Sequence, residues 1–112
     1  MEAYRRSLAI NADDHELCYN LGVQLGDTGQ IDEEIEMYRK AIAIKPDFGK
    51  AWANLGVAYA SSGRFDDAEE PMLKAVQYQP DAKTNWINLA RLHQARGRPE
   101  AAAEALAKSR SL

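Results

Sequence analysis

Four consecutive residues near the start of the chain have the side-chain types of metal and acid–base sites: Asp13, Asp14, His15 and Glu16. Consecutive residues on a helix point in different directions, because only positions three or four apart share a face. A carboxylate just before a helix satisfies its free N–H groups, so Asp13 or Asp14 is better interpreted as a helix cap. We expect no metal site in this stretch.

The other reactive side chains are isolated in the sequence. Cys18 is the single cysteine, which excludes an internal disulfide and a cysteine zinc site, and we interpret it as core filling. His93 has no ligand partner at helical spacing and is predicted to be a partly buried core residue. The glycines Gly22, Gly26 and Gly29 lack the Lys-Ser/Thr of a phosphate loop. The sequence therefore predicts a chain that is not an enzyme and has no cofactor or metal.

Composition and charge favour a folded protein-binding chain. The 112 residues are 46% hydrophobic and 28% charged, as expected for one compact domain or one short array. The net charge of −3 is unevenly spread, with 8 Lys/Arg against 15 Asp/Glu in residues 1–82 and 6 against 2 in residues 83–112. An acidic body argues against nucleic-acid binding, which needs a basic face. No apolar run is long enough to insert into a membrane and no signal-peptide pattern is present, so we expect a cytoplasmic location.

A repeat of 34 residues runs through the chain. The shift places Asn20-Leu21-Gly22 on Asn54-Leu55-Gly56, and it likewise pairs Gly29 with Gly63, Pro46 with Pro80, Trp52 with Trp86, Gly63 with Gly97 and Ala68 with Ala102. A fixed period of this length is typical of repeat architectures. The predicted units are residues 15–48, 49–82 and 83–112, preceded in residues 1–14 by the second helix of a truncated repeat. This arrangement suggests that the true N-terminus is missing.

Each unit reads as two helices separated by a glycine turn. In the first unit, one helix has a face formed by Cys18, Leu21, Gly22 and Leu25, and the next has a stripe formed by Ile31, Ile35, Tyr38 and Ile42. Gly29 is placed to adopt a left-handed conformation between them, Pro46 ends the second helix, and Asp47 is a plausible cap for the third. The later units follow the same plan, with helices predicted over 65–78 and 99–111. With the helix over 1–10, the pattern predicts an all-α fold of about seven helices.

Two residues depart from the repeat pattern. Glu34 stands where the other units have Ala68 and Ala102, and we expect its stem to lie along the neighbouring helix with the carboxylate in water. Pro71 lies inside the predicted helix over 65–78, where it removes a backbone donor and crowds the carbonyl of Asp67. We therefore predict a kink or a late helix start there.

The repeated set of residues resembles the tetratricopeptide repeat family over essentially the whole chain. The second unit carries the match as Trp52, Leu55, Gly56, Tyr59, Ala68, Met72, Ala75 and Pro80. The resemblance implies an α-solenoid of antiparallel helix pairs, wound into a right-handed superhelix. It also implies a concave groove lined by the first helix of each pair, where such modules bind proteins.

The resemblance also places the candidate binding residues. Asparagine recurs at one groove position of all three units, as Asn20, Asn54 and Asn88. A primary amide offers two donors and an acceptor, which suits the backbone of an extended peptide, although asparagine at this position is equally explained as a structural preference of the family. In the same register the groove contains the apolar Tyr19, Val23, Val57 and Ile87 and one cation, Arg91.

The leading hypothesis is a noncatalytic module that binds an extended peptide or a helix of a protein partner in this groove. A second hypothesis is a spacer within a longer solenoid, which self-associates through an open end near Tyr4 and Leu8. A third is a substrate-recruiting arm of a larger enzyme, such as a glycosyltransferase. The sequence favours the first without excluding the others.

Overall fold

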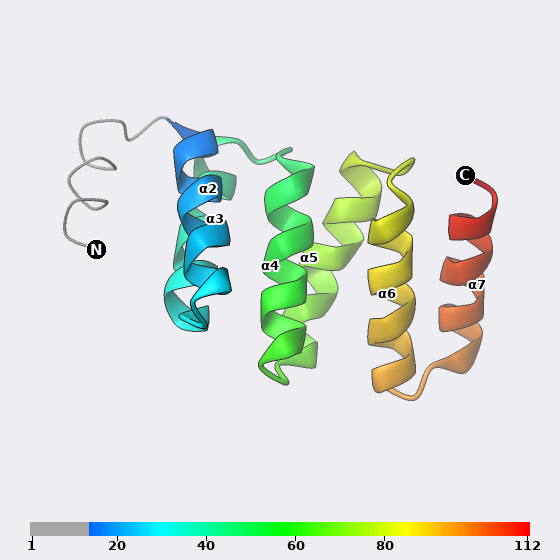
Figure 1. Ribbon diagram of the computed structural model, residues 1–112. Coiled ribbons are helices and arrows are strands. Elements are labelled where there is room, and N and C mark those ends of the chain that lie inside the picture. Colours follow the sequence, from blue (N-terminus) through cyan, green and yellow to red (C-terminus); the bar gives the residue numbers. More distant parts are fainter. Residues whose placement is uncertain (1–13) are drawn as a thin grey trace.

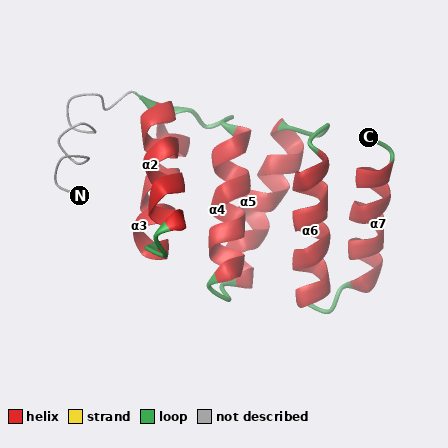
Figure 2. Cartoon of the chain, in the orientation of Figure 1, coloured by secondary structure: helices red, strands yellow, loops and turns green. Residues whose placement is uncertain are grey.

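The computed structural model describes residues 14–112, and these residues form six α-helices (Figure 1). They are α2 (His15–Asp27), α3 (Ile31–Ile44), α4 (Gly49–Ser61), α5 (Phe65–Tyr78), α6 (Lys83–Ala95) and α7 (Pro99–Arg110). Short turns join them, and no strand occurs in this part of the chain (Figure 2). The six helices predicted for the three units are thus confirmed, out of about seven predicted for the whole chain. The helix predicted over residues 1–10, with Tyr4 and Leu8, lies outside the described residues.

The helices form three consecutive antiparallel pairs, α2 with α3, α4 with α5 and α6 with α7. Figure 1 shows α2, α4 and α6 side by side in one layer, with α3 and α5 behind them and α7 at the C-terminal end. Neighbouring pairs also pack on each other, through α3 against α4 and α5 against α6. This is the predicted all-α solenoid, in which the first helix of every pair lies on the same side.

The turns within the three pairs share one backbone conformation. Gly29, Gly63 and Gly97 have φ angles of 77°, 80° and 72°, a left-handed conformation that costs glycine little. The residue after each glycine donates its N–H to a carbonyl five residues back, as in Arg64 N to Tyr59 O at 2.9 Å. The predicted role of these glycines is confirmed.

The tryptophans join successive units. Trp52 is half-buried and donates its indole N–H to the carbonyl of Pro46 at 2.7 Å, and Trp86 does the same to Pro80 at 2.6 Å. Each bond runs from the first helix of one pair to the proline that ends the preceding pair. The proline therefore ends a helix and also supplies an acceptor that fixes the next one.

Two predictions at helix ends are wrong. The N-cap of α4 is Phe48, without a side-chain cap, while Asp47 accepts a hydrogen bond from Lys45 Nζ at 3.1 Å. Of the two alternatives predicted at Pro71, the late start does not occur, because α5 begins at Phe65 and runs through the proline, and the kink stays a prediction.

The core runs along the array between the two layers of helices. Its larger cluster joins residues of all three pairs, including Tyr38, Leu55, Tyr59, Leu89 and Leu92. A smaller cluster around Cys18 and Phe48 closes the first pair against the start of α4. Cys18 is 1% exposed, which confirms that it fills core space.

Candidate functional site

The eight predicted groove residues all lie on α2, α4 and α6, the layer seen from the front in Figure 1. Asn20, Val57 and Arg91 are exposed, and the rest are half-buried: Tyr19, Val23, Asn54, Ile87 and Asn88. Helices α2 and α4 bring four of these residues together. Val23, Asn54 and Val57 line one pocket, and Tyr19 accepts a hydrogen bond from Asn54. Ile87, Asn88 and Arg91 on α6 and Asn20 on α2 do not line that pocket.

The pocket has a volume of about 390 Å³ and lies between the α2–α3 pair and α4. Its walls are largely apolar or small, and its polar groups come from α2, α3 and α4. The lining residues are Val23, Gly26, Asp27, Gly29, Ile31, Glu34, Tyr38, Asn54, Val57, Ala58 and Ser61. Two carboxylates are present, and no lysine, arginine or histidine of the part of the chain that the structure describes lines the pocket.

Two glycines of α2 make room for the pocket floor. A Cβ at Gly22 would lie 2.5 Å from the ring of Tyr38, and one at Gly26 would lie 2.5 Å from the carboxylate of Glu34. Gly22 and Gly26 are four residues apart on one helix, as are Glu34 and Tyr38 on the next, so each pair lies on a single helix face. The larger side chains of α3 therefore occupy the space that the glycines of α2 leave free.

A chain of hydrogen bonds links the three helices at this pocket. Asn54 donates its side-chain N–H groups to the hydroxyls of Tyr19 at 3.2 Å and Tyr38 at 3.4 Å, and Tyr38 donates to Glu34 at 3.1 Å. Burial raises the pKa of Tyr38, so its hydroxyl remains a donor. The amide nitrogen of Asn54 is thus engaged within the protein, and its oxygen is the group left for a ligand.

The three asparagines differ in this respect. Within residues 14–112, the side chains of Asn20 and Asn88 make no hydrogen bond, whereas Asn54 makes two. Sequence reasoning treated them as equivalent because they share one repeat position. The difference comes from Tyr19 and Tyr38, which lie 35 and 16 positions from Asn54.

The carboxylate of Glu34 does not extend freely into water, contrary to the expectation from its sequence position. It is half-buried against Gly26 and accepts the hydrogen bond of Tyr38. Burial raises the pKa of Glu34, the hydrogen bond from Tyr38 opposes this, and the nearby charge of Asp27 raises it further. Gly26, which has no side chain, leaves room for the carboxylate. The repeat pattern, which has Ala68 and Ala102 at the position of Glu34, did not predict this placement.

We expect Glu34→Gln to raise the free energy of unfolding at neutral pH. Because folding raises the pKa of Glu34, stability falls as pH rises from its unfolded pKa through its folded pKa, and the folded protein bears that cost at pH 7. Glutamine keeps an acceptor for Tyr38 and removes the charge next to Asp27. Urea denaturation between pH 3 and pH 8, as a range spanning the ordinary carboxyl pKa, should show the gain at neutral pH and its loss in acid.

Glu33→Gln is the matched control, since it removes the same charge from the same helix turn but does not line the pocket. Equal stabilities of the Glu34 variant and wild type across the whole pH range would contradict the prediction.

The remaining candidates from the sequence have structural roles. Asp14 accepts a hydrogen bond from Leu17 N at 3.0 Å, which confirms it as the cap of α2, and Asp13 lies outside the described residues. His93 is half-buried as predicted, and its Nδ1 is buried without a hydrogen-bond partner. Between residues 14 and 112, no three His, Cys, Asp or Glu side chains gather closely enough to hold a metal ion.

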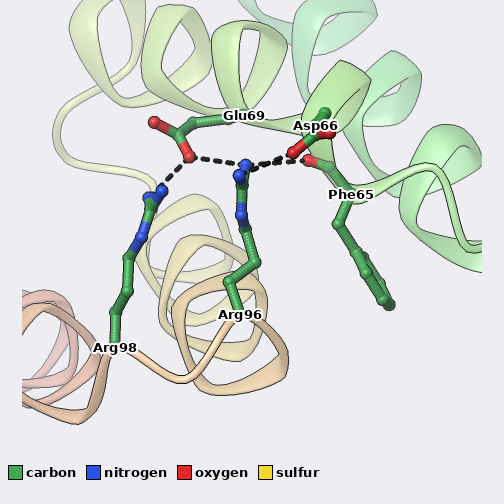
Figure 3. Close-up of polar contacts among 5 residues, drawn as sticks. All are labelled: Phe65, Asp66, Glu69, Arg96 and Arg98. Atoms are coloured by element: carbon green, nitrogen blue, oxygen red, sulfur yellow. Dashed lines mark hydrogen bonds and ion pairs between the residues drawn. The ribbon is translucent and has the colours of Figure 1, made fainter.

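A charged cluster that sequence reasoning missed joins the second and third pairs (Figure 3). Arg96, in the turn after α6, contacts Asp66 at 2.6 Å and Glu69 at 2.9 Å, and Arg98 contacts Glu69 at 2.6 Å. Figure 3 shows both arginines reaching from the α6–α7 turn to the first turns of α5. The partners are 27 to 30 residues apart, a little less than one repeat, and pairing charges at that spacing would have found the cluster.

None of the helices between residues 14 and 112 combines the length and the apolar character that crossing a bilayer requires. The three helix pairs, their glycine turns and their stacking define an α-solenoid repeat protein. Sequence models of protein families agree: one described as a TPR repeat matches residues 24–63, and one described as a tetratricopeptide repeat matches residues 54–111, more than half of the chain. The chain belongs to the tetratricopeptide repeat family.

Solved structures with the same fold include those of the protein MamA. One crystal structure of MamA superposes with a TM-score of 0.92 at 21% sequence identity. The match covers 98% of this chain and 64% of the MamA chain. A structure of MamA AMB-1 gives a TM-score of 0.86 at 26% sequence identity, and the match covers 99% of this chain and 61% of the MamA chain. This chain thus spans less than two thirds of their length. A sequence comparison with curated proteins finds no match.

Proposed function

We propose that the chain is a noncatalytic protein-interaction module that binds an extended peptide or a helix of a partner across α2, α4 and α6. The observation that supports this most directly is the pocket between α2 and α4. It combines the apolar Val23 and Val57 with the polar Asn54 on the layer predicted to line the groove. Small concave sites with apolar walls and few polar groups are typical of ligand binding.

The exposure of the groove residues supports the same proposal. Val57 is 38% exposed on α4, next to Leu55 and Ala58, which are buried in the core. On α6, Ile87 and Asn88 are half-buried and Arg91 is exposed. A partner lying across the three helices would bury these apolar side chains and meet the free amides of Asn20 and Asn88, and Arg91 would attract an acidic group.

Peptides selected from a random displayed library against the full chain test this proposal. We expect Val57→Arg to weaken the selected peptides by about tenfold or more, because it places a bulky charge where an apolar side chain should be covered. Leu73→Arg is the matched control, since Leu73 is 45% exposed on α5, outside the groove layer. Circular dichroism should verify that both variants fold.

Equal loss of binding in the two variants, or no loss in Val57→Arg, would place the binding surface elsewhere. Failure to select any peptide would count against an extended-peptide ligand. The first two outcomes would contradict binding in the groove, and the third would contradict an extended peptide as its ligand.

A further inference from the structure

The pocket between α2, α3 and α4 has a charge that its own residues do not neutralise. Asp27 and Glu34 both line it, and among residues 14–112 no lysine, arginine or histidine lines it with them. Glu34 accepts one hydrogen bond, from Tyr38, although a carboxylate has capacity for several. A half-buried carboxylate without a cation is unfavourable unless another group compensates the charge.

The shape of the pocket complements a long side chain with a charged end. Val23, Ile31, Val57 and Ala58 provide apolar lining, and the carboxylate of Glu34 lies against the backbone of Gly26, where a Cβ would be 2.5 Å away. The amide oxygen of Asn54 is available as a second acceptor, because its nitrogen is held by Tyr19 and Tyr38. Aliphatic stems of lysine and arginine pack on apolar surface while their ends bind carboxylates.

We propose that this pocket binds the side chain of an arginine or lysine from the partner segment, with the stem between Val23 and Val57 and the cation on Glu34. This inference rests on the proposed function for its source of ligand and adds the chemical class that the groove selects. Asp27 contributes negative potential at the mouth, and the fixed donors of Asn54 hold its oxygen in place. Tyr38 positions the carboxylate of Glu34 and does not itself contact the cation.

The test is a nuclear magnetic resonance titration of the full isotope-labelled chain with N-acetyl-arginine methylamide. N-acetyl-citrulline methylamide is the matched probe, because it has nearly the same shape without the charge. We expect the arginine probe to shift the amide signals of Gly26, Glu34 and Val57, and to bind several-fold more tightly than the citrulline probe.

Glu34→Gln should reduce the preference for arginine over citrulline to about one, because the hydrogen bond to a charged group is the larger contribution. Glu33→Gln is the control with the same change of net charge, and it should keep the preference of the wild type. The stability of both variants is measured in parallel, so a loss of binding is not confused with unfolding.

Equal binding of the two probes by the wild type, an unchanged preference in Glu34→Gln, or no shift at the pocket would each overturn the inference. The displayed library distinguishes failure of the cation-binding pocket from failure of the proposed peptide-binding function. Peptides that bind through Val57 but show no enrichment of arginine or lysine would leave the groove function standing and remove the inference. If no peptide binds while the arginine probe selects the pocket, the cation site stands and the extended-peptide function fails.

Discussion

We expect Tyr38→Ala to lower the free energy of unfolding by about 3–5 kcal/mol, the range found when a large buried aromatic ring is removed. Tyr38 is 1% exposed and belongs to the core cluster that joins all three helix pairs. Its ring fills the space left by Gly22, and its hydroxyl connects Asn54 of α4 to Glu34 of α3. The substitution removes packing within the first pair and the polar link to the second pair together.

Urea denaturation followed by circular dichroism measures the loss, and hydrogen exchange shows where it falls. Amides of α2 and α3 should lose protection more than those of α6 and α7, because repeats in a solenoid are stabilised mainly by their neighbours. Tyr38→Phe separates the two contributions, since it keeps the ring. We expect it to cost about 1.5–3 kcal/mol, the usual value for a lost hydrogen bond to a charged group, because Glu34 loses its donor while Asn54 retains Tyr19 as an acceptor. A loss below about 1 kcal/mol for Tyr38→Ala would contradict the assigned packing.

The second large effect is expected at Leu92, in the last helix pair. Leu92 is 2% exposed in α6 and packs in the same core cluster as Leu89 and Ala105. Leu92→Ala leaves a cavity and should lower the free energy of unfolding by about 2–5 kcal/mol. The lower end applies if the small residues of α7, such as Ala102 and Ala105, allow the site to collapse.

Leu73→Ala is the control for Leu92→Ala, because it makes the same chemical change at a side chain that is 45% exposed. It should alter stability by no more than about 0.5 kcal/mol. Comparable losses in the two variants, measured by the same urea denaturation, would show that Leu92 is not part of the packed core.

Most of the fold could be predicted because its determinants are local and recur every 34 residues. The helix predicted over 65–78 is observed as Phe65–Tyr78, and the last helix, predicted over 99–111, ends one residue earlier at Arg110. Gly29, Gly63 and Gly97 mark the turns within the pairs and Pro46 and Pro80 follow the ends of α3 and α5, whereas Pro71 lies inside α5 and marks no end. Helix capping is less certain from sequence, since Lys45 competes for the carboxylate of Asp47.

The candidate site could be predicted only as a set of positions. The repeat register placed Val23, Asn54 and Val57 on the correct helices, and the structure brings them to one pocket. It gave no information about side-chain direction, so the inward carboxylate of Glu34 and the bonds of Asn54 to two tyrosines were missed. Both depend on the close approach of α2 and α3 at Gly22 and Gly26, which is a tertiary property.

The cluster of Arg96 and Arg98 with Asp66 and Glu69 makes the two joints of the array chemically different. The joint between the first two pairs contains no carboxylate–arginine pair among the described residues, and is held by hydrogen bonds such as Asn54 with Tyr19 and Arg39 with Tyr59 and by apolar packing. Dissolved ions screen partly exposed charges far more than they weaken buried apolar contacts. We therefore expect added salt to weaken the contact between the second and third pairs more than the contact between the first and second.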